Sequence, residues 1–153
     1  MDLIAGDARE ILLALGVDEW RGLEDRARFA AHLPLGCGPD PEWLDLFAQA
    51  AREATGKDQP GPLRESTFLL SGRLASFSER MVERVDPRWT DAVARLPDSL
   101  VDRIAARWVE LLDCQGCEVD AEDKSMLREL AAQLVDFCRR AEGAEDVLFS
   151  WSI

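Results

Sequence analysis

Apolar residues recur every three or four positions along most of this chain, which is the spacing of one face of an α-helix. The segments with this spacing are residues 3–15, 24–32, 41–56, 70–85, 87–96, 98–112 and 121–142. Polar and loop-forming residues separate them. The pattern therefore predicts a mainly α protein, a compact bundle of about six to seven helices in a single domain over residues 1–153.

Capping signals support several of these helices. Asp40 and Asp86 each precede a proline, which combines an N-cap residue with proline at the first helical position. Asp120 is the expected N-cap of the last helix, and Gly143 is its expected end. Residues 57–63 hold two prolines and a glycine, so we expect a flexible internal linker there.

The C-terminal tail, residues 147–153, has a different pattern. It is apolar, aromatic and β-branched, so it should be extended. It could form a short strand or lie as a lid over the core. Because no partner strand is evident elsewhere in the sequence, the lid is favoured. An extended apolar tail could also complete a homodimer.

The chain is strongly acidic, with 18 Lys and Arg against 30 Asp and Glu, a net charge of −12 and a pI of about 4.5. Residues 1–56 carry −6 and residues 110–153 carry −7, whereas residues 57–109 carry +1. This balance argues against a nucleic-acid binder and against docking on anionic lipid. Sixteen of the cations are Arg and two are Lys, which we attribute to coding bias before anion recognition.

Nothing in the sequence indicates export or membrane insertion. The first charges are Asp2 and Asp7, unlike the basic start of a signal peptide. The longest apolar run, residues 11–17, is too short to span a bilayer. We therefore expect a cytoplasmic protein whose four cysteines are mostly reduced.

The motif that most suggests chemistry is the pair Cys114 and Cys117, separated by two residues. It follows a predicted helix, whose negative end disfavours a thiolate, so a thioredoxin-like role is not expected. The spacing also suits two zinc ligands. Folding would have to supply the others, for which the candidates are Cys138 first and then Cys37, His32 and Glu110. A labile or regulatory Cys114–Cys117 disulfide is an equal alternative.

Catalysis has little support in the sequence. His32 is the only histidine, and a nucleophile–base pair with Cys37 would lack an evident third group to orient the imidazole. The 30 acidic residues leave room for a carboxylate-based active site, but no spacing favours one. The sequence therefore leans away from an enzyme.

Tryptophan is the residue type that best indicates a binding surface here. Trp108 lies on a helical core stripe, so we expect it to be buried. Trp43, Trp89 and Trp151 lie near helix starts or the C-terminus. Because Trp is enriched at binding hot spots, these three are candidate anchors for a partner.

Together these observations favour a non-catalytic protein–protein interaction module that acts as an inhibitor or regulator. An acidic helical protein suits a basic protein partner by charge complementarity. The first alternative is a metal- or redox-responsive regulator that uses Cys114 and Cys117, with zinc as the metal. The second alternative is an enzyme with a carboxylate-based site.

Overall fold

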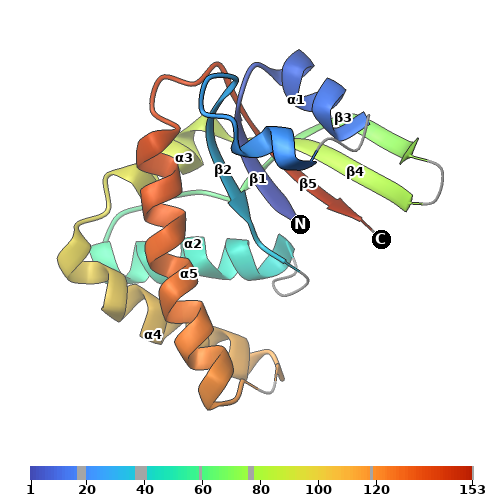
Figure 1. Ribbon diagram of the computed structural model, residues 1–153. Helices are drawn as coiled ribbons and strands as arrows, with labels where there is room; N and C mark the ends of the chain where they lie inside the picture. The colour runs from blue at the N-terminus through green and yellow to red at the C-terminus, as the bar shows by residue number, and fades with distance from the viewer. Residues whose placement is uncertain (17–19, 37–40, 59, 76–77, 118, 153) are drawn as a thin grey trace. The chain divides into compact units, whose positions relative to one another are not determined.

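The computed structural model is an α+β fold and not the helical bundle that the sequence pattern predicts (Figure 1). It describes residues 1–16, 20–36, 41–58, 60–75, 78–117 and 119–152. In chain order the elements are β1 (Asp2–Gly6), α1 (Ala8–Gly16), η1 (Trp20–Glu24), β2 (Phe29–Pro34), α2 (Pro41–Thr55), β3 (Arg64–Ala75), β4 (Ser78–Val85), α3 (Pro87–Ala94), α4 (Asp98–Cys114), α5 (Ala121–Arg140) and β5 (Asp146–Ser152).

The chain divides into two compact units. The sheet unit comprises Met1–Gly38, Arg64–Pro87 and Arg140–Ile153. The helical unit comprises Pro39–Leu63 and Arg88–Arg139. Since the chain passes between the units four times, neither is a continuous stretch of sequence.

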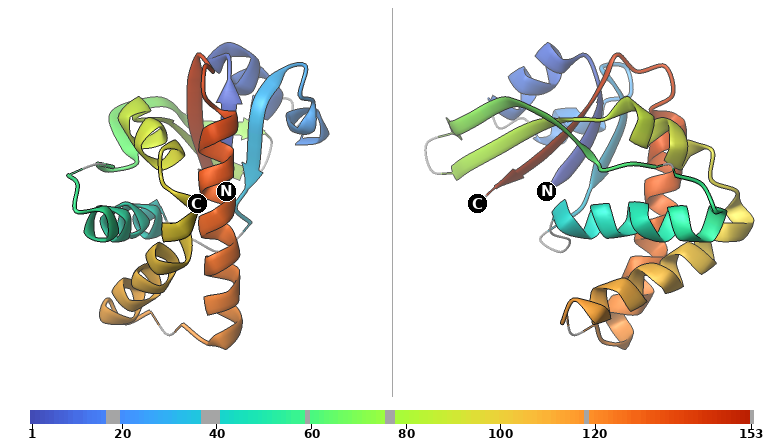
Figure 2. Two further views of the ribbon diagram at one scale, coloured as in Figure 1. Left: turned by 90° about the vertical axis from the view of Figure 1, so that its left-hand side faces the viewer. Right: turned by 180° about the vertical axis from the view of Figure 1, so that it is seen from behind.

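The sheet unit is built on five antiparallel strands in the order β2-β1-β5-β4-β3 (Figures 1 and 2). Strands β1 and β5, from the two ends of the chain, are neighbours, with Leu3 opposite Phe149. On its other side β5 pairs with β4, where Val82 lies opposite Ser150. The C-terminal tail is therefore a strand with both edges paired inside the chain. The homodimer stays a prediction, and it would need a surface other than the backbone edge of β5.

The helix predicted over residues 70–85 is wrong, because this segment lies in the β3–β4 hairpin. The helical spacing of its apolar residues was misleading. Within it, Ser71 and Gly72 are poor helix formers. Strand β4 also pairs along its length with β5, which lies more than 60 residues further along the chain. Here, pairing with a strand that is distant in the sequence outweighs the helical spacing of the apolar residues.

The helix predicted over residues 24–32 is also wrong, because residues 26–28 form a turn and residues 29–32 belong to β2. Burial alternates along that strand, with Phe29, Ala31 and Leu33 buried. A period of two is the signature of a strand with one buried face, and this signal was present in the sequence.

The helix predicted over residues 3–15 is half right, since β1 precedes α1. Asp7 separates the two elements and caps the helix, because its Oδ1 accepts the backbone N–H groups of Arg9 and Glu10 at 2.8 and 3.1 Å. Helix α1 then packs its apolar side into the core of the sheet unit. The buried members of that core are Ile4, Ile11, Ala14, Leu15, Leu23, Phe29, Val82 and Leu148.

The helical unit confirms the helices predicted over residues 41–56, 98–112 and 121–142, whereas the predicted N-cap Asp40 lies outside the described residues. In α5, Asp120 Oδ1 accepts the N–H groups of Glu122 and Asp123 at 2.7 and 2.9 Å, and Asp123 Oδ2 accepts the N–H of Asp120 at 3.2 Å. This reciprocal pair is a capping box. In the core of the unit, the ring of Phe47 lies 5.2 Å from that of Trp108, which is fully buried as expected.

The described residues of the predicted linker, 57–58 and 60–63, lie outside any helix, and two side chains of α2 bind residues 60 and 63. Asp45 Oδ1 accepts the N–H of Leu63 at 2.9 Å, and Arg52 donates to the carbonyl of Pro60 at 2.6 Å. Within the described parts of the chain, no helix combines the length and the apolar character needed to cross a bilayer.

Candidate functional site

The structure places the predicted cysteine ligands at opposite ends of one helix. Cys114 is the last residue of α4 and is exposed, and Cys117 lies in the turn before α5. Cys138 is near the other end of α5, about 25 Å along its axis at about 1.5 Å per residue. The described residues contain no group of three His, Cys, Asp or Glu side chains that could hold a metal ion. Cys37 lies outside the described residues.

Cys138 is a core residue, and Cys117 contributes its backbone N–H to the cap at the end of α4. Burial raises the pKa of the Cys138 thiol well above its usual range, so the thiol stays protonated in the core. At the end of α4, the N–H of Gly116 bonds the carbonyl of Asp113, and the N–H of Cys117 bonds that of Leu112. With φ of +83° at Gly116, this is a Schellman cap. The Cys114–Cys117 disulfide stays a prediction.

The three predicted tryptophan anchors differ in burial. Trp89 is fully buried and packs 6.3 Å from Phe47, centroid to centroid, so it belongs to the core of the helical unit. Trp43 is half-buried on α2. Trp151 is half-buried on β5, where its ring stacks on Phe149 at 5.0 Å. Only Trp43 and Trp151 therefore present part of their rings to solvent.

His32 has a partner that the sequence did not signal. Its Nε2 lies 2.9 Å from Asp2 Oδ1, a hydrogen bond in which the carboxylate accepts. The two side chains come from the paired strands β1 and β2, and both are mostly buried, at 12% and 13% exposed. Asp2 thus orients the imidazole. The proposed nucleophile, Cys37, cannot be placed beside it.

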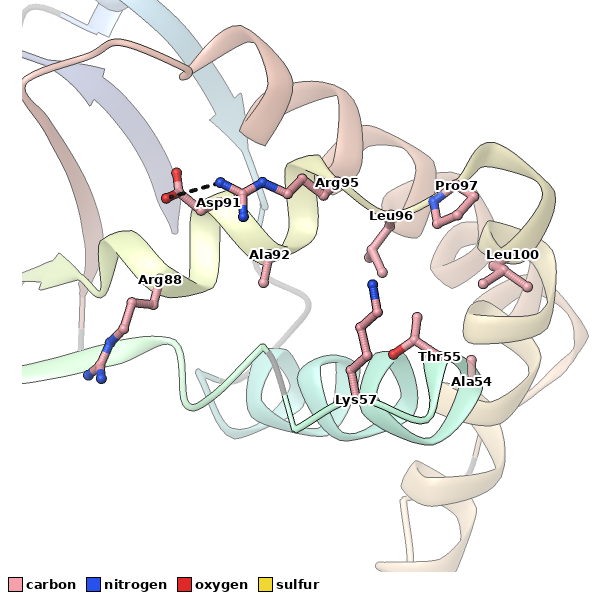
Figure 3. A pocket seen from close by; sticks show the side chains of 10 residues that line it. All are labelled: Ala54, Thr55, Lys57, Arg88, Asp91, Ala92, Arg95, Leu96, Pro97 and Leu100. Carbon is pink, nitrogen blue, oxygen red and sulfur yellow. Dashed lines mark ion pairs between the residues drawn. The ribbon is translucent and has the colours of Figure 1, made fainter.

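A pocket of about 600 Å³ lies within the helical unit (Figure 3). Its walls are the C-terminal end of α2, one face of α3, the α3–α4 connection and the first turn of α4. The lining residues are Ala54, Thr55, Lys57, Arg88, Asp91, Ala92, Arg95, Leu96, Pro97 and Leu100. The volume falls within the range of about 300–1,000 Å³ that is typical of small-molecule sites.

The polar groups of this pocket differ in how firmly they are engaged. Thr55 donates its hydroxyl to the carbonyl of Ala51 at 2.8 Å. Arg95 is 3.8 Å from the carboxylate of Asp91, but their side chains are 76% and 61% exposed, so the ion pair is weak. The ammonium of Lys57 has no hydrogen-bond or ion-pair partner among the described residues. Figure 3 shows this side chain reaching from the end of α2 toward Leu96.

The charge of the pocket is opposite to that of the unit around it. The helical unit holds nine Lys and Arg against 16 Asp and Glu, a net charge of −7. The lining has three cations, Lys57, Arg88 and Arg95, and one carboxylate, Asp91, a net charge of +2. A concave surface whose lining carries a net charge concentrates ligands of the opposite sign. The arrangement is therefore suited to an anion.

One arginine of α5 fixes the apolar wall of the pocket. Arg139 donates to the carbonyls of Ala94 and Leu96 at 3.2 and 2.8 Å, and to the carboxylate of Asp98 at 2.7 Å. These bonds span the whole α3–α4 connection. They set the position of Leu96 and leave its carbonyl oxygen already bonded.

Beside the pocket lies a second cluster, in which two carboxylates balance the charge of one arginine. Arg107 of α4 donates to Glu53 of α2 at 2.6 Å and to Glu110 at 2.8 Å. The bond from Arg107 is the main cause that lowers the pKa of Glu53, with a further bond from Gln49. This cluster lines a smaller hollow of about 360 Å³ that shares Ala54 with the pocket. Its role is to tie α2 to α4.

The sequence reasoning missed all three cations of the pocket. Their signal was weak: Lys57, Arg88 and Arg95 all fall in the one part of the chain, residues 57–109, that is not acidic.

The chain was also compared with protein-family models, curated proteins and solved structures, and nothing in any of the three comparisons matches it.

Proposed function

We propose that this chain is a non-catalytic regulatory module that acts by binding, and that its helical unit takes an anionic ligand in the pocket beside Lys57. The observation that carries the proposal is the reversal of charge, a lining of net +2 within a unit of net −7. Lys and Arg hold their charge at neutral pH and donate strong hydrogen bonds to carboxylate and phosphate groups.

Two further features support binding at this place. The wall formed by the α3–α4 connection is held by Arg139, so the site is formed before a ligand arrives. Lys57 has no competing partner among the described residues, and the Arg95–Asp91 pair is exposed enough to exchange Asp91 for a ligand anion.

The test is calorimetric titration with a panel of organic carboxylates, phosphate monoesters and sulfonates. We expect binding at one site per chain, and about tenfold weaker binding in Lys57→Met, because a hydrogen bond to a charged group is lost. Lys124→Met is the matched control, since Lys124 is the other lysine and lies in the exposed first turn of α5. Equal affinity in the two variants, or no binding by any anion, would contradict the proposal.

A basic protein partner is the second candidate function, and the charge of both units favours it. The sheet unit holds nine cations against 14 carboxylates, so it is acidic at −5, as the helical unit is at −7. Such charge speeds association with a basic surface and its effect falls with salt. The association rate of a captured partner should therefore drop as salt rises, and a rate independent of salt would remove this candidate.

A further inference from the structure

The pocket has a charged end and an apolar end. In Figure 3, the head groups of Arg88, Arg95 and Asp91 lie at one end, and Leu96, Pro97 and Leu100 lie toward the other. Lys57 reaches toward Leu96, where the apolar end begins. This division indicates how polar and apolar groups are arranged in the ligand, in addition to the ligand's charge. The inference drawn from it rests on the proposed function.

The charged end favours a single acidic group. Lys57 and Arg95 can both turn to one anion, because Lys57 has no partner in the described chain and Arg95 is held only by an exposed ion pair. Asp91 stays in the same lining and repels further negative charge. A ligand with one acidic head therefore fits this end better than a polyanion.

The apolar end offers little to a polar ligand. Leu96 is buried, and its carbonyl oxygen is already bonded to Arg139 at 2.8 Å. Proline has no backbone N–H, so Pro97 has no backbone donor. Leu100 is half-buried, and its own N–H bonds the carbonyl of Pro97 at 2.9 Å. A polar group placed here would find no free backbone donor or acceptor on Leu96 and no backbone donor on Pro97, so this end favours apolar groups.

We infer that the ligand of this pocket is an amphipathic organic anion, with one acidic head at Lys57 and Arg95 and an apolar body against Leu96, Pro97 and Leu100. Carboxylates and phosphate monoesters share this head-group chemistry. The apolar body supplies affinity in proportion to the surface that it buries, and the acidic head fixes its direction.

The experiment is a calorimetric titration with butanoate, hexanoate and octanoate, with octyl phosphate as the second head group. Octanol and inorganic phosphate serve as probes that lack the head or the body. A fully buried methylene improves affinity by about fourfold, which corresponds to ~0.8 kcal/mol. Because the pocket is partly open, we expect about tenfold between butanoate and octanoate. Comparison of octanoate with octyl phosphate identifies the preferred acidic head.

Substitutions at two positions, Lys57 and Leu100, separate the ends of the pocket. Lys57→Met should weaken octanoate and leave octanol unchanged, whereas Lys57→Arg should retain binding. Leu100→Ser should flatten the dependence on chain length. Leu13→Ser is its control, because Leu13 is 63% exposed on α1 of the sheet unit. Circular dichroism of each variant checks that it is folded.

The outcomes distinguish this inference from the proposed function. If inorganic phosphate binds as tightly as octyl phosphate and binding depends on Lys57, the proposed anion site stands and the apolar body is wrong. If octanol binds as tightly as octanoate, the acidic head is wrong. If none of these probes binds, the inference fails, and the wider anion panel decides the proposed function.

Discussion

At the scale of single residues, the helical unit uses its cations in two ways. Arg107 and Arg139 are held by carboxylates and carbonyls and act as structural ties. Lys57 has no such partner among the described residues, and Arg95 has only an exposed one. A coding bias explains why most cations are Arg, but it does not explain why Lys57 and two arginines line one hollow. The difference lies in the partners, which the sequence does not reveal.

The Glu53–Arg107 ion pair makes the free energy of unfolding depend on pH, and the lowered pKa of Glu53 sets the direction of that dependence. The pKa of Glu53 is lowered in the folded state, so its contribution is complete above the ordinary glutamate value of 4.5 and is lost as pH falls through the lowered pKa. Glu53→Gln should therefore be less stable than the parent at pH 7 and equal to it at strongly acidic pH. Urea unfolding at both pH values measures this. At pH 7, Arg107→Gln should destabilise Glu53→Gln less than it destabilises the parent, because both substitutions remove the Glu53–Arg107 bond and only the bond from Arg107 to Glu110 is left to lose.

At the scale of elements, the sequence predicted the helices of the helical unit and missed the strands. The sequence of α5 contains a capping box and apolar residues with the 3.6-residue period of a helix, all within one continuous segment. Strands β1 and β5 stabilise each other from opposite ends of the chain, so no local window contains the interaction. The α3–α4 connection had only Pro97 as a signal, and its use as a pocket wall depends on Arg139 some 40 residues later.

Removal of the Arg139 tie should loosen the pocket wall. Arg139→Met loses bonds to two carbonyls and a carboxylate, which should cost about 1.5–3 kcal/mol in the free energy of unfolding. Hydrogen exchange at the amides of Leu96 and Leu100 should become faster. Arg103→Met is the control, because Arg103 is exposed on the same unit. Unchanged exchange at both amides in Arg139→Met would contradict this role.

The assignment of the C-terminal tail as a central strand also has a stability consequence. Leu148 is fully buried on β5 and belongs to the core packed by α1. Leu148→Ala should therefore cost about 2–5 kcal/mol. Leu13→Ala, at an exposed position, should change stability by less than about 0.5 kcal/mol. Urea unfolding measures both, and a small effect of Leu148→Ala would contradict the placement of β5 within the sheet.

At the scale of the whole molecule, the net charge of −12 favours a cationic partner, whereas the proposed site favours an anion. The net charge of the chain favours the attraction of basic partners and does not indicate a cationic hollow. The hollow arises only when residues 54–57 meet residues 88–100 in one unit. Composition therefore accounts for the net charge of both units. It does not predict the site, because the site depends on which charged side chains the fold brings together.

Nuclear magnetic resonance mapping with octanoate tests the central claim most directly. Titration of octanoate into the ¹⁵N-labelled protein should shift the amides of residues 54–57, 88–96 and 100, and about tenfold more octanoate should be needed for the same shifts in Lys57→Met. Shifts confined to the sheet unit, or the same concentration dependence in Lys57→Met as in the parent, would contradict the account.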